Sequence, residues 1–294
     1  MVFQFARDVF YRSDIYNRML RRHGTSQIHA LVTDPVPGDP VRGAGILNGE
    51  MMLAARKRTL GPYPFAADLK SRRAVAELYG FSWLRDLAAL SAPGARETAQ
   101  ALIRDWLRHH DRWDAVTWAP DVAGTRILAW LNYIDFATEE ADNGLRAEIA
   151  AAASAQLRHL AGNNRSGNEH SGLDESPFTV GAALIAGAVG LPGLDPLLDT
   201  GLERLRAAVA RDILADGGHR TRTPETALRT LARLVAAARA LRAGRRPVPD
   251  FLTDALSRMA PAVKATVLGD GGLAAFNGGG NGSAPAVTAI LGAA

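Results

Sequence analysis

The residues best suited to chemistry lie in one short turn, Ala215-Asp216-Gly217-Gly218-His219-Arg220-Thr221-Arg222-Thr223-Pro224. The turn combines a titratable imidazole with guanidinium groups, and its glycine pair permits backbone conformations that other residues resist. The Thr-Pro pair that closes it is typical of a helix start. His219, Arg220 and Arg222 therefore stand at a helix entrance, where free N–H groups and the helix dipole favour an anion. The turn predicts a site for an acidic ligand.

A second candidate is an aromatic and basic face on one predicted helix. Arg126, Trp130 and Tyr133 recur at spacings of four and three residues, so they share a face, and Trp118 lies shortly before them. Such a face can stack sugar rings and pair with acidic groups. It fits equally well a core helix whose rings pack together and whose Arg126 binds neighbouring carbonyl groups.

A third candidate is the polar loop 163–171, which contains Asn163, Asn164 and His170. Side-chain amides can neutralise a carboxylate by hydrogen bonding; the alternative is a mobile surface loop. The pair His109-His110 is interpreted as structural, because histidines at a helix C-terminus favour the dipole. No zinc, nucleotide-phosphate or serine-hydrolase motif occurs. We therefore expect no metal and no cofactor.

Helices must position these residues. From Ser71 onward, apolar residues recur at helical spacing and the connections contain Pro, Gly or Asn. The predicted helices cover 72–90, 94–110, 122–138, 144–161, 177–190, 195–214, 224–242 and 248–265. Short loops make consecutive helices antiparallel neighbours. Without a strand period or a strict sequence repeat, the pattern predicts an all-α fold, an irregular helical toroid rather than a regular solenoid.

The two ends of the chain differ from this middle part. Residues 1–70 are predicted to form an opening helix and an extended Pro/Gly-rich arm, with a small strand or hairpin near 45–53, packed on a toroid of residues 71–268. Residues 269–294 are loop-rich, and 284–294 is compatible with a short final helix. We expect three units with these boundaries, the last one leading toward a further domain.

Composition limits the function classes. The chain has 294 residues, a formal net charge of +4 and no cysteine, which excludes disulfides and thiolate metal sites. The modest positive charge suits an acidic partner but does not require one. No apolar run is long enough to span a bilayer, and no signal peptide is visible, so the cytoplasm is the default location. We expect no nucleic-acid partner.

Several segments, in their order and spacing, resemble the N-terminal helical domain of the heparinase II/III family. They are Trp118-Ala119-Pro120, Arg126-Ile127, Trp130-Leu131, Asp216-Gly217-Gly218-His219, Thr223-Pro224, Gly269-Asp270-Gly271-Gly272-Leu273 and Phe276-Asn277, supported by 80–86 and 104–107. The resemblance covers nearly the whole chain. It implies an incomplete (α/α) toroid that is normally followed by an antiparallel β-sandwich domain, absent from this chain and its expected partner.

The resemblance also implies an activity. Members of the family are polysaccharide lyases that cleave uronic-acid glycans by β-elimination, which needs a carboxylate-neutralising group, a base and an acid. It implies catalytic roles for His219 and Asn164, and an acidic polysaccharide as the partner. The implied substrate-binding residues are Arg126, Trp118, Tyr133, Arg220, Arg222 and Asn163. An isolated helical half is expected to be inactive, and the family favours the periplasm or cell envelope.

One position departs from the family pattern. Where the family carries a catalytic tyrosine, this chain has Thr226, which supplies neither a usable acid nor a base. Two alternatives therefore stand beside the lyase. One is a non-catalytic protein of the cell envelope that binds acidic glycans on the same fold. The other is a glycoside hydrolase, which would need two carboxylates across a groove, such as Asp121 and Asp216.

Overall fold

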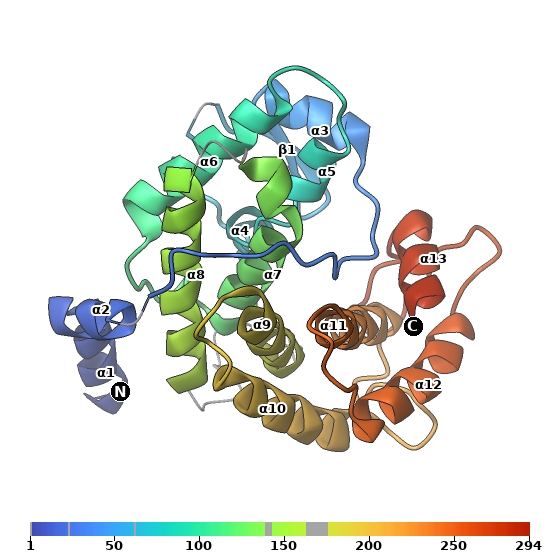
Figure 1. Ribbon diagram of the computed structural model, residues 1–294. Helices are drawn as coiled ribbons and strands as arrows, with labels where there is room; N and C mark the ends of the chain where they lie inside the picture. The colour runs from blue at the N-terminus through green and yellow to red at the C-terminus, as the bar shows by residue number, and fades with distance from the viewer. Residues whose placement is uncertain (1, 23, 62, 139–142, 163–175) are drawn as a thin grey trace.

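The computed structural model describes residues 2–22, 24–61, 63–138, 143–162 and 176–294. In these residues the chain is an array of helices with one small hairpin (Figure 1). The helices are α1 Val2–Arg12, α2 Asp14–Arg21, α3 Pro40–Leu47, α4 Arg72–Tyr79, α5 Leu84–Ala88, α6 Ala95–His110, α7 Pro120–Ala137, α8 Asn143–Gly162, α9 Ser176–Gly190, α10 Leu197–Asp212, α11 Pro224–Ala243, α12 Asp250–Lys264 and α13 Ala284–Ala293. The strands are β1 Glu50–Leu53 and β2 Arg56–Thr59.

The predicted all-α toroid is confirmed. Helix α9 occupies the centre, where it packs against α7, α10 and α11, while α10 and α12 lie on the outside (Figure 1). Nearly every described side chain of α9 is buried. Its small residues allow this crowding: a Cβ added to Gly187 would stand 2.4 Å from the Leu157 side chain of α8. The inner helices pack closely because glycine and alanine replace larger side chains at the crossings.

One predicted helix is wrong. Instead of a single helix over 72–90, α4 ends at Tyr79 and α5 begins at Leu84. The break contains Phe81, which has a left-handed backbone (φ +58°) and a fully buried ring. That ring stacks on Phe65 at 5.6 Å between centroids and meets Trp106 edge-on. Aromatic packing at this point outweighs the continuous helical periodicity of the segment.

The N-terminal segment lies against the C-terminal ends of the inner helices. Extended residues 24–39 cross in front of α8 and α7 (Figure 1). The N–H groups of His29 and Leu31 donate to the carbonyls of Gly190 and Leu131, each at 2.8 Å. Gly190 is the last residue of α9, where the helix itself supplies no donor to the carbonyl, and Leu131 lies two residues before Tyr133, whose non-helical backbone kinks α7.

Of the range 45–53, where a small strand or hairpin was expected, residues 50–53 form β1, whereas 45–47 belong to α3. The hairpin extends further along the chain, because β1 pairs with β2 and Ala54 and Ala55 join the two strands with positive φ angles. The Pro-rich arm is extended only as far as Asp39. There the Asp39 side chain accepts a hydrogen bond from Val41 N–H at 2.9 Å and caps α3, a helix that the sequence pattern did not predict. Among the described helices, none has the length and apolar character needed to cross a membrane.

Candidate functional site

The inner helices α7, α9 and α11 begin at the same end of the toroid. The guanidinium of Arg233 on α11 forms hydrogen bonds to both of the other helices. Its Nη2 donates to Thr125 Oγ1 of α7 at 3.0 Å, and its Nε donates to Thr179 Oγ1 of α9 at 3.2 Å. Both threonines lie in the first two turns of their helices and Arg233 lies in the third turn of α11, so one side chain joins the N-terminal halves of all three helices. We call this region the helix-start end.

Helix α4 begins there as well. Arg73 in its first turn forms an ion pair with Glu225 in the first turn of α11, with Nη2 and Oε1 3.2 Å apart. Glu225 also accepts hydrogen bonds from Gly280 N–H and from Arg229. Burial alone would raise the pKa of the Glu225 carboxyl, but the Gly280 N–H and the charges of Arg229 and Arg73 outweigh it and hold that pKa below its ordinary value.

Asp121 is a second carboxyl of this end, at the second position of α7. Burial raises the pKa of Asp121 above its ordinary value; hydrogen bonds from backbone N–H groups and the charges of Arg72 and Arg233 oppose the shift. Its Oδ1 is buried and accepts no hydrogen bond from the described residues. The converging helix N-termini and the arginines favour an anion at this end. Asp121 is a carboxyl group there whose ionised form is disfavoured by burial.

The turn that carries His219 closes the entrance to α11. Gly217 has φ +78°, and a Cβ placed on it would stand 2.0 Å from the carbonyl oxygen of Arg258, so this position requires glycine. The two arginines of the turn each form an ion pair, one with the end of α10 and one within the turn. Arg220 binds the buried carboxylate of Asp212, and Arg222 binds Asp216, both at 2.6 Å. The Arg222 and Gly218 N–H hydrogen bonds lower the pKa of Asp216.

His219 is a buried residue of this turn, with an exposed fraction of 1%. Its ring lies beside Phe178 of α9, with 6.2 Å between the centroids. The Thr221 hydroxyl lies 2.9 Å from His219 Nδ1 and the Thr221 N–H lies 3.2 Å from it, so this ring nitrogen is occupied by contacts within the turn. In this structure the imidazole holds the turn against the start of α9 and presents almost no surface.

Arg126 and Trp118 lie in the core rather than on a binding face. Arg126 has no exposed surface; it donates to Gln156 and to the carbonyls of Tyr79 and Thr117, and its guanidinium lies 4.2 Å from the Trp106 ring centroid. Burial lowers its pKa to about 9. Trp118 is 1% exposed and packs against α8. The core alternative for this face is therefore the one the structure supports, and we do not propose either residue as substrate-binding.

The remaining predicted residues are not brought to His219 in the described structure. Tyr133 lies near the far end of α7, about 20 Å along the helix from Pro120, and its hydroxyl reaches Asp34 of the N-terminal arm at 3.5 Å. Asn163, Asn164 and His170 lie outside the described residues. Asp121 is partly buried with its Oδ1 enclosed, whereas Asp216 is exposed and paired with Arg222, so the geometry gives no support to a hydrolase pair.

The sequence reasoning missed the arginines and threonines of the helix-start end, above all Arg233 and Thr125. One signal pointed to them: α7, α9 and α11 each carry a proline in the first turn, at 120, 177 and 224. A proline in the first turn of every second helix indicates that these helices run parallel to one another. Their first turns must then lie at the same end of the toroid. In the part of the chain that the structure describes, no cluster of His, Asp and Glu side chains has the arrangement of a metal site.

The comparison of sequences and the comparison of structures point to different proteins. No family model matches the chain. FtsZ-localized protein C of Caulobacter vibrioides is 36% identical over 250 residues, which cover 84% of this chain but 42% of that protein. Among solved structures, heparinase III aligns over 87% of this chain with a TM-score of 0.65 and 14% identity, covering 43% of its own chain. The heparan sulfate lyase HepC of Pedobacter heparinus aligns over 88% of this chain, with a TM-score of 0.56, 13% identity and 44% of its own chain covered.

These comparisons confirm the fold: the described helices match the helical toroid of heparinase III. At such low identity the structural likeness extends to the fold alone. The chain spans less than half the length of the curated relative and of both lyases.

Proposed function

We propose that this chain is a non-catalytic binding module that associates with FtsZ, built on the helical toroid of the heparinases. A fold of this kind hosts different functions, so the site and the relatives carry the proposal rather than the toroid itself. The association with FtsZ is supported by the relative FtsZ-localized protein C, which is 36% identical over 250 residues that cover 84% of this chain and 42% of that protein.

The observation that carries the non-catalytic part is the state of the His219 turn. Proton transfer needs an acid or base within hydrogen-bond reach of the substrate. His219 is 1% exposed and its Nδ1 already accepts a hydrogen bond from Thr221 N–H. Thr226, at the position of the family's tyrosine, lies half-buried in the first turn of α11 and cannot exchange a proton near neutral pH. The turn is organised as a structural element of the toroid.

A direct binding measurement tests the proposal. The 294-residue chain is immobilised, and FtsZ from the organism that encodes it is passed over the surface in biolayer interferometry. We expect FtsZ to bind the immobilised chain saturably. A control protein whose size and charge resemble those of FtsZ is expected not to bind. A signal for FtsZ no larger than for the control at all concentrations contradicts the association.

The lyase remains the second candidate, and one observation favours it. Four helix N-termini and the side chains of Arg72, Arg73, Arg229 and Arg233 gather at the helix-start end, an arrangement that suits an acidic sugar. β-Elimination produces an unsaturated uronate with a characteristic ultraviolet absorbance. We expect no rise in that absorbance with heparan sulfate, alginate or hyaluronan, whether or not these glycans bind. A sustained rise establishes the lyase and removes the non-catalytic proposal.

A further inference from the structure

We propose that the pocket between the β1–β2 hairpin and α6, together with the free edge of β2, docks an extended acidic peptide segment of the partner protein. This inference rests on the proposed function, because it locates the partner's site on the chain. Three features carry it: an apolar pocket, a strand whose outer edge is free and which runs into the pocket wall, and a row of cations on that strand.

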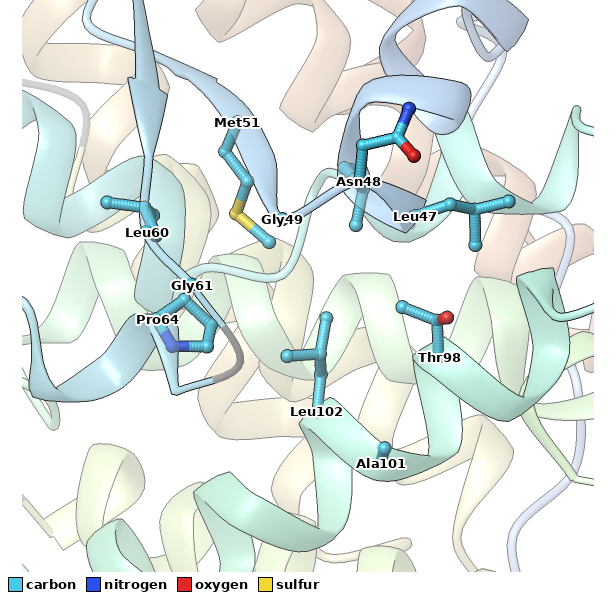
Figure 2. Close-up of a pocket in the computed structure, with 11 residues that line it drawn as sticks. Leu47, Asn48, Gly49, Met51, Leu60, Gly61, Pro64, Thr98, Ala101 and Leu102 are labelled. Atoms are coloured by element: carbon cyan, nitrogen blue, oxygen red, sulfur yellow. The ribbon is translucent and has the colours of Figure 1, made fainter.

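The pocket has a volume of about 370 Å³ and lies at the open end of the hairpin. Figure 2 shows Met51 above it, Leu60 and Pro64 on one side and Leu102 of α6 below. Asn48 and Thr98 are its polar neighbours. With this lining, an apolar side chain fits better than a charged one, since a charge placed there would lose its water without gaining a partner.

The strand β2 offers a free edge that leads to the pocket. β1 packs against α3 and α4, whereas β2 is mostly exposed. Leu60 N–H donates to Gly49 C=O at 2.9 Å; because bonded pairs alternate in an antiparallel ladder, the backbone groups of Lys57 and Thr59 face outward. No backbone group in the described part of the chain bonds to them.

An edge of this kind can bind an extended peptide by adding a strand. The strand continues directly into Leu60 and Gly61, which line the pocket. A peptide paired with β2 would therefore arrive at the pocket with its backbone already held. Its next inward-facing side chain is the natural occupant of the apolar space, since alternate side chains of a strand point to the same face.

The charges on β2 select the chemistry of the peptide. Arg56, Lys57 and Arg58 are consecutive, and Lys57 forms an ion pair with Glu50 at 2.7 Å. Arg56 is exposed and has no ion-pair partner among the described residues. Arg58 stands opposite Met51 in the ladder, so it shares the pocket face, and its Nε is buried without a hydrogen-bond partner in the described structure.

The neighbouring carboxylate on α4, Glu77, does not neutralise the positive charges of Arg56 and Arg58. Glu77 is bound by Arg73 and by the N–H of Ala54. Arg58 lies two residues before Leu60 of the pocket wall, and Arg56 stands nearer the hairpin turn. Guanidinium groups along a strand that leads to an apolar pocket suit a peptide that carries acidic residues beside an apolar one. An acidic glycan would use the cations but would leave the apolar pocket and the strand edge unfilled.

Blocking the pocket tests its role. Ala101 lies on the exposed surface of α6 and lines the pocket, so Ala101→Phe fills the space without removing a core side chain. Ala207→Phe, on the exposed face of α10, is the matched control. We expect at least tenfold weaker binding to FtsZ by biolayer interferometry for Ala101→Phe and unchanged binding for Ala207→Phe, with melting temperatures within about 2 °C of the wild type.

Reversing a charge tests the peptide's acidity. Arg56→Glu is expected to weaken FtsZ binding at least threefold at low salt, with a smaller effect as the salt concentration rises, because exposed charges are screened. Lys264→Glu makes the same change in charge at an exposed position on α12 and is expected to leave binding unchanged.

The outcomes separate the two proposals. If the wild type binds FtsZ and both variants bind as tightly, the docking site is overturned while the association with FtsZ stands. If the wild type does not bind FtsZ, the association fails and the docking site fails with it. If heparan sulfate displaces FtsZ and Ala101→Phe binds normally while Arg56→Glu does not, the cations hold a polyanion and the peptide site is overturned.

Discussion

Arg73 and Glu225 are 152 positions apart in sequence, and their ion pair at 3.2 Å joins the first turn of α4 to the first turn of α11. The two side chains differ in environment, because the Arg73 side chain is 56% exposed and that of Glu225 is 13% exposed. An exposed ion pair contributes little to stability, whereas a buried carboxylate with several donors is costly to remove. The stabilising role therefore lies mainly with Glu225.

Glu225→Gln is expected to destabilise the fold by about 2 kcal/mol, because the amide cannot satisfy Arg229, Arg73 and Gly280 N–H together. Arg73→Ala is expected to cost less than about 1 kcal/mol. Urea denaturation of the single and double variants measures both effects and their coupling. A larger loss for Arg73→Ala than for Glu225→Gln would show that the cation dominates.

His219→Ala is expected to lower the melting temperature by several degrees and to leave FtsZ binding unchanged, since the ring is buried and holds the turn by its hydrogen bond from Thr221. Differential scanning calorimetry and biolayer interferometry are the measurements. A variant that keeps its melting temperature but loses binding to FtsZ or to an acidic glycan would place His219 in a binding site instead.

Arg126→Met is expected to destabilise the chain by about 3 kcal/mol, because it leaves the buried carbonyls of Tyr79 and Thr117 and the amide of Gln156 without their donor. Chemical denaturation gives the value. Arg204→Met, which removes a half-buried guanidinium from the last carbonyls of α8, serves as the comparison and is expected to cost less. Equal losses of unfolding free energy for the two variants would mean that the full burial of Arg126 does not increase the cost of removing its guanidinium.

His159 makes stability depend on pH. Its Nδ1 lies 2.7 Å from the Tyr16 hydroxyl, and burial lowers its pKa from 6.5 to about 4. Because the folded pKa lies below the unfolded one, the unfolded chain binds the proton more readily. The contribution is intact above the unfolded pKa and is lost as the pH falls from about 6.5 toward 4, by up to about 3 kcal/mol.

His159→Gln is the variant that isolates this effect. Thermal denaturation at several pH values should show a steeper loss of stability on acidification for the wild type than for His159→Gln. The raised pKa values of Asp86, Asp111 and Asp121 act in the opposite direction, but they are present in both proteins. Parallel pH profiles for the two proteins would argue against a depressed His159 pKa.

Gly217→Ala is expected to destabilise the fold by more than about 2 kcal/mol, since the added Cβ meets the Arg258 carbonyl at 2.0 Å on a backbone of φ +78°. Gly278→Ala is the matched control: its φ is +81°, and no heavy atom lies within 4 Å of the added Cβ. It is expected to cost about 1 kcal/mol, from backbone strain alone. Similar melting temperatures for both variants would show that the turn relaxes away from α12.

The amino-acid sequence alone was sufficient for helices α6 to α12 and their order. The 3.6-residue period and the punctuation by Pro, Gly and Asn are local signals, and seven of the eight predicted ranges correspond to α6 to α12 within a few residues. The eighth was wrong because the packing of Phe81 against Phe65 and Trp106 depends on residues distant in sequence. Local periodicity carries no information about such contacts.

Burial is what only the tertiary structure decided. Arg126 and Tyr133 share a helix face in the sequence, yet Arg126 is enclosed between α7, α6 and α8, and Tyr133 faces the N-terminal arm. His219 has the residue type of a catalyst, but the closure of its turn against α9 covers the ring. Arg233 has no motif, and it gains its place because parallel inner helices bring Thr125 and Thr179 to one guanidinium. Residue types show which chemistry is available, and the distances created by packing decide which side chains can take part.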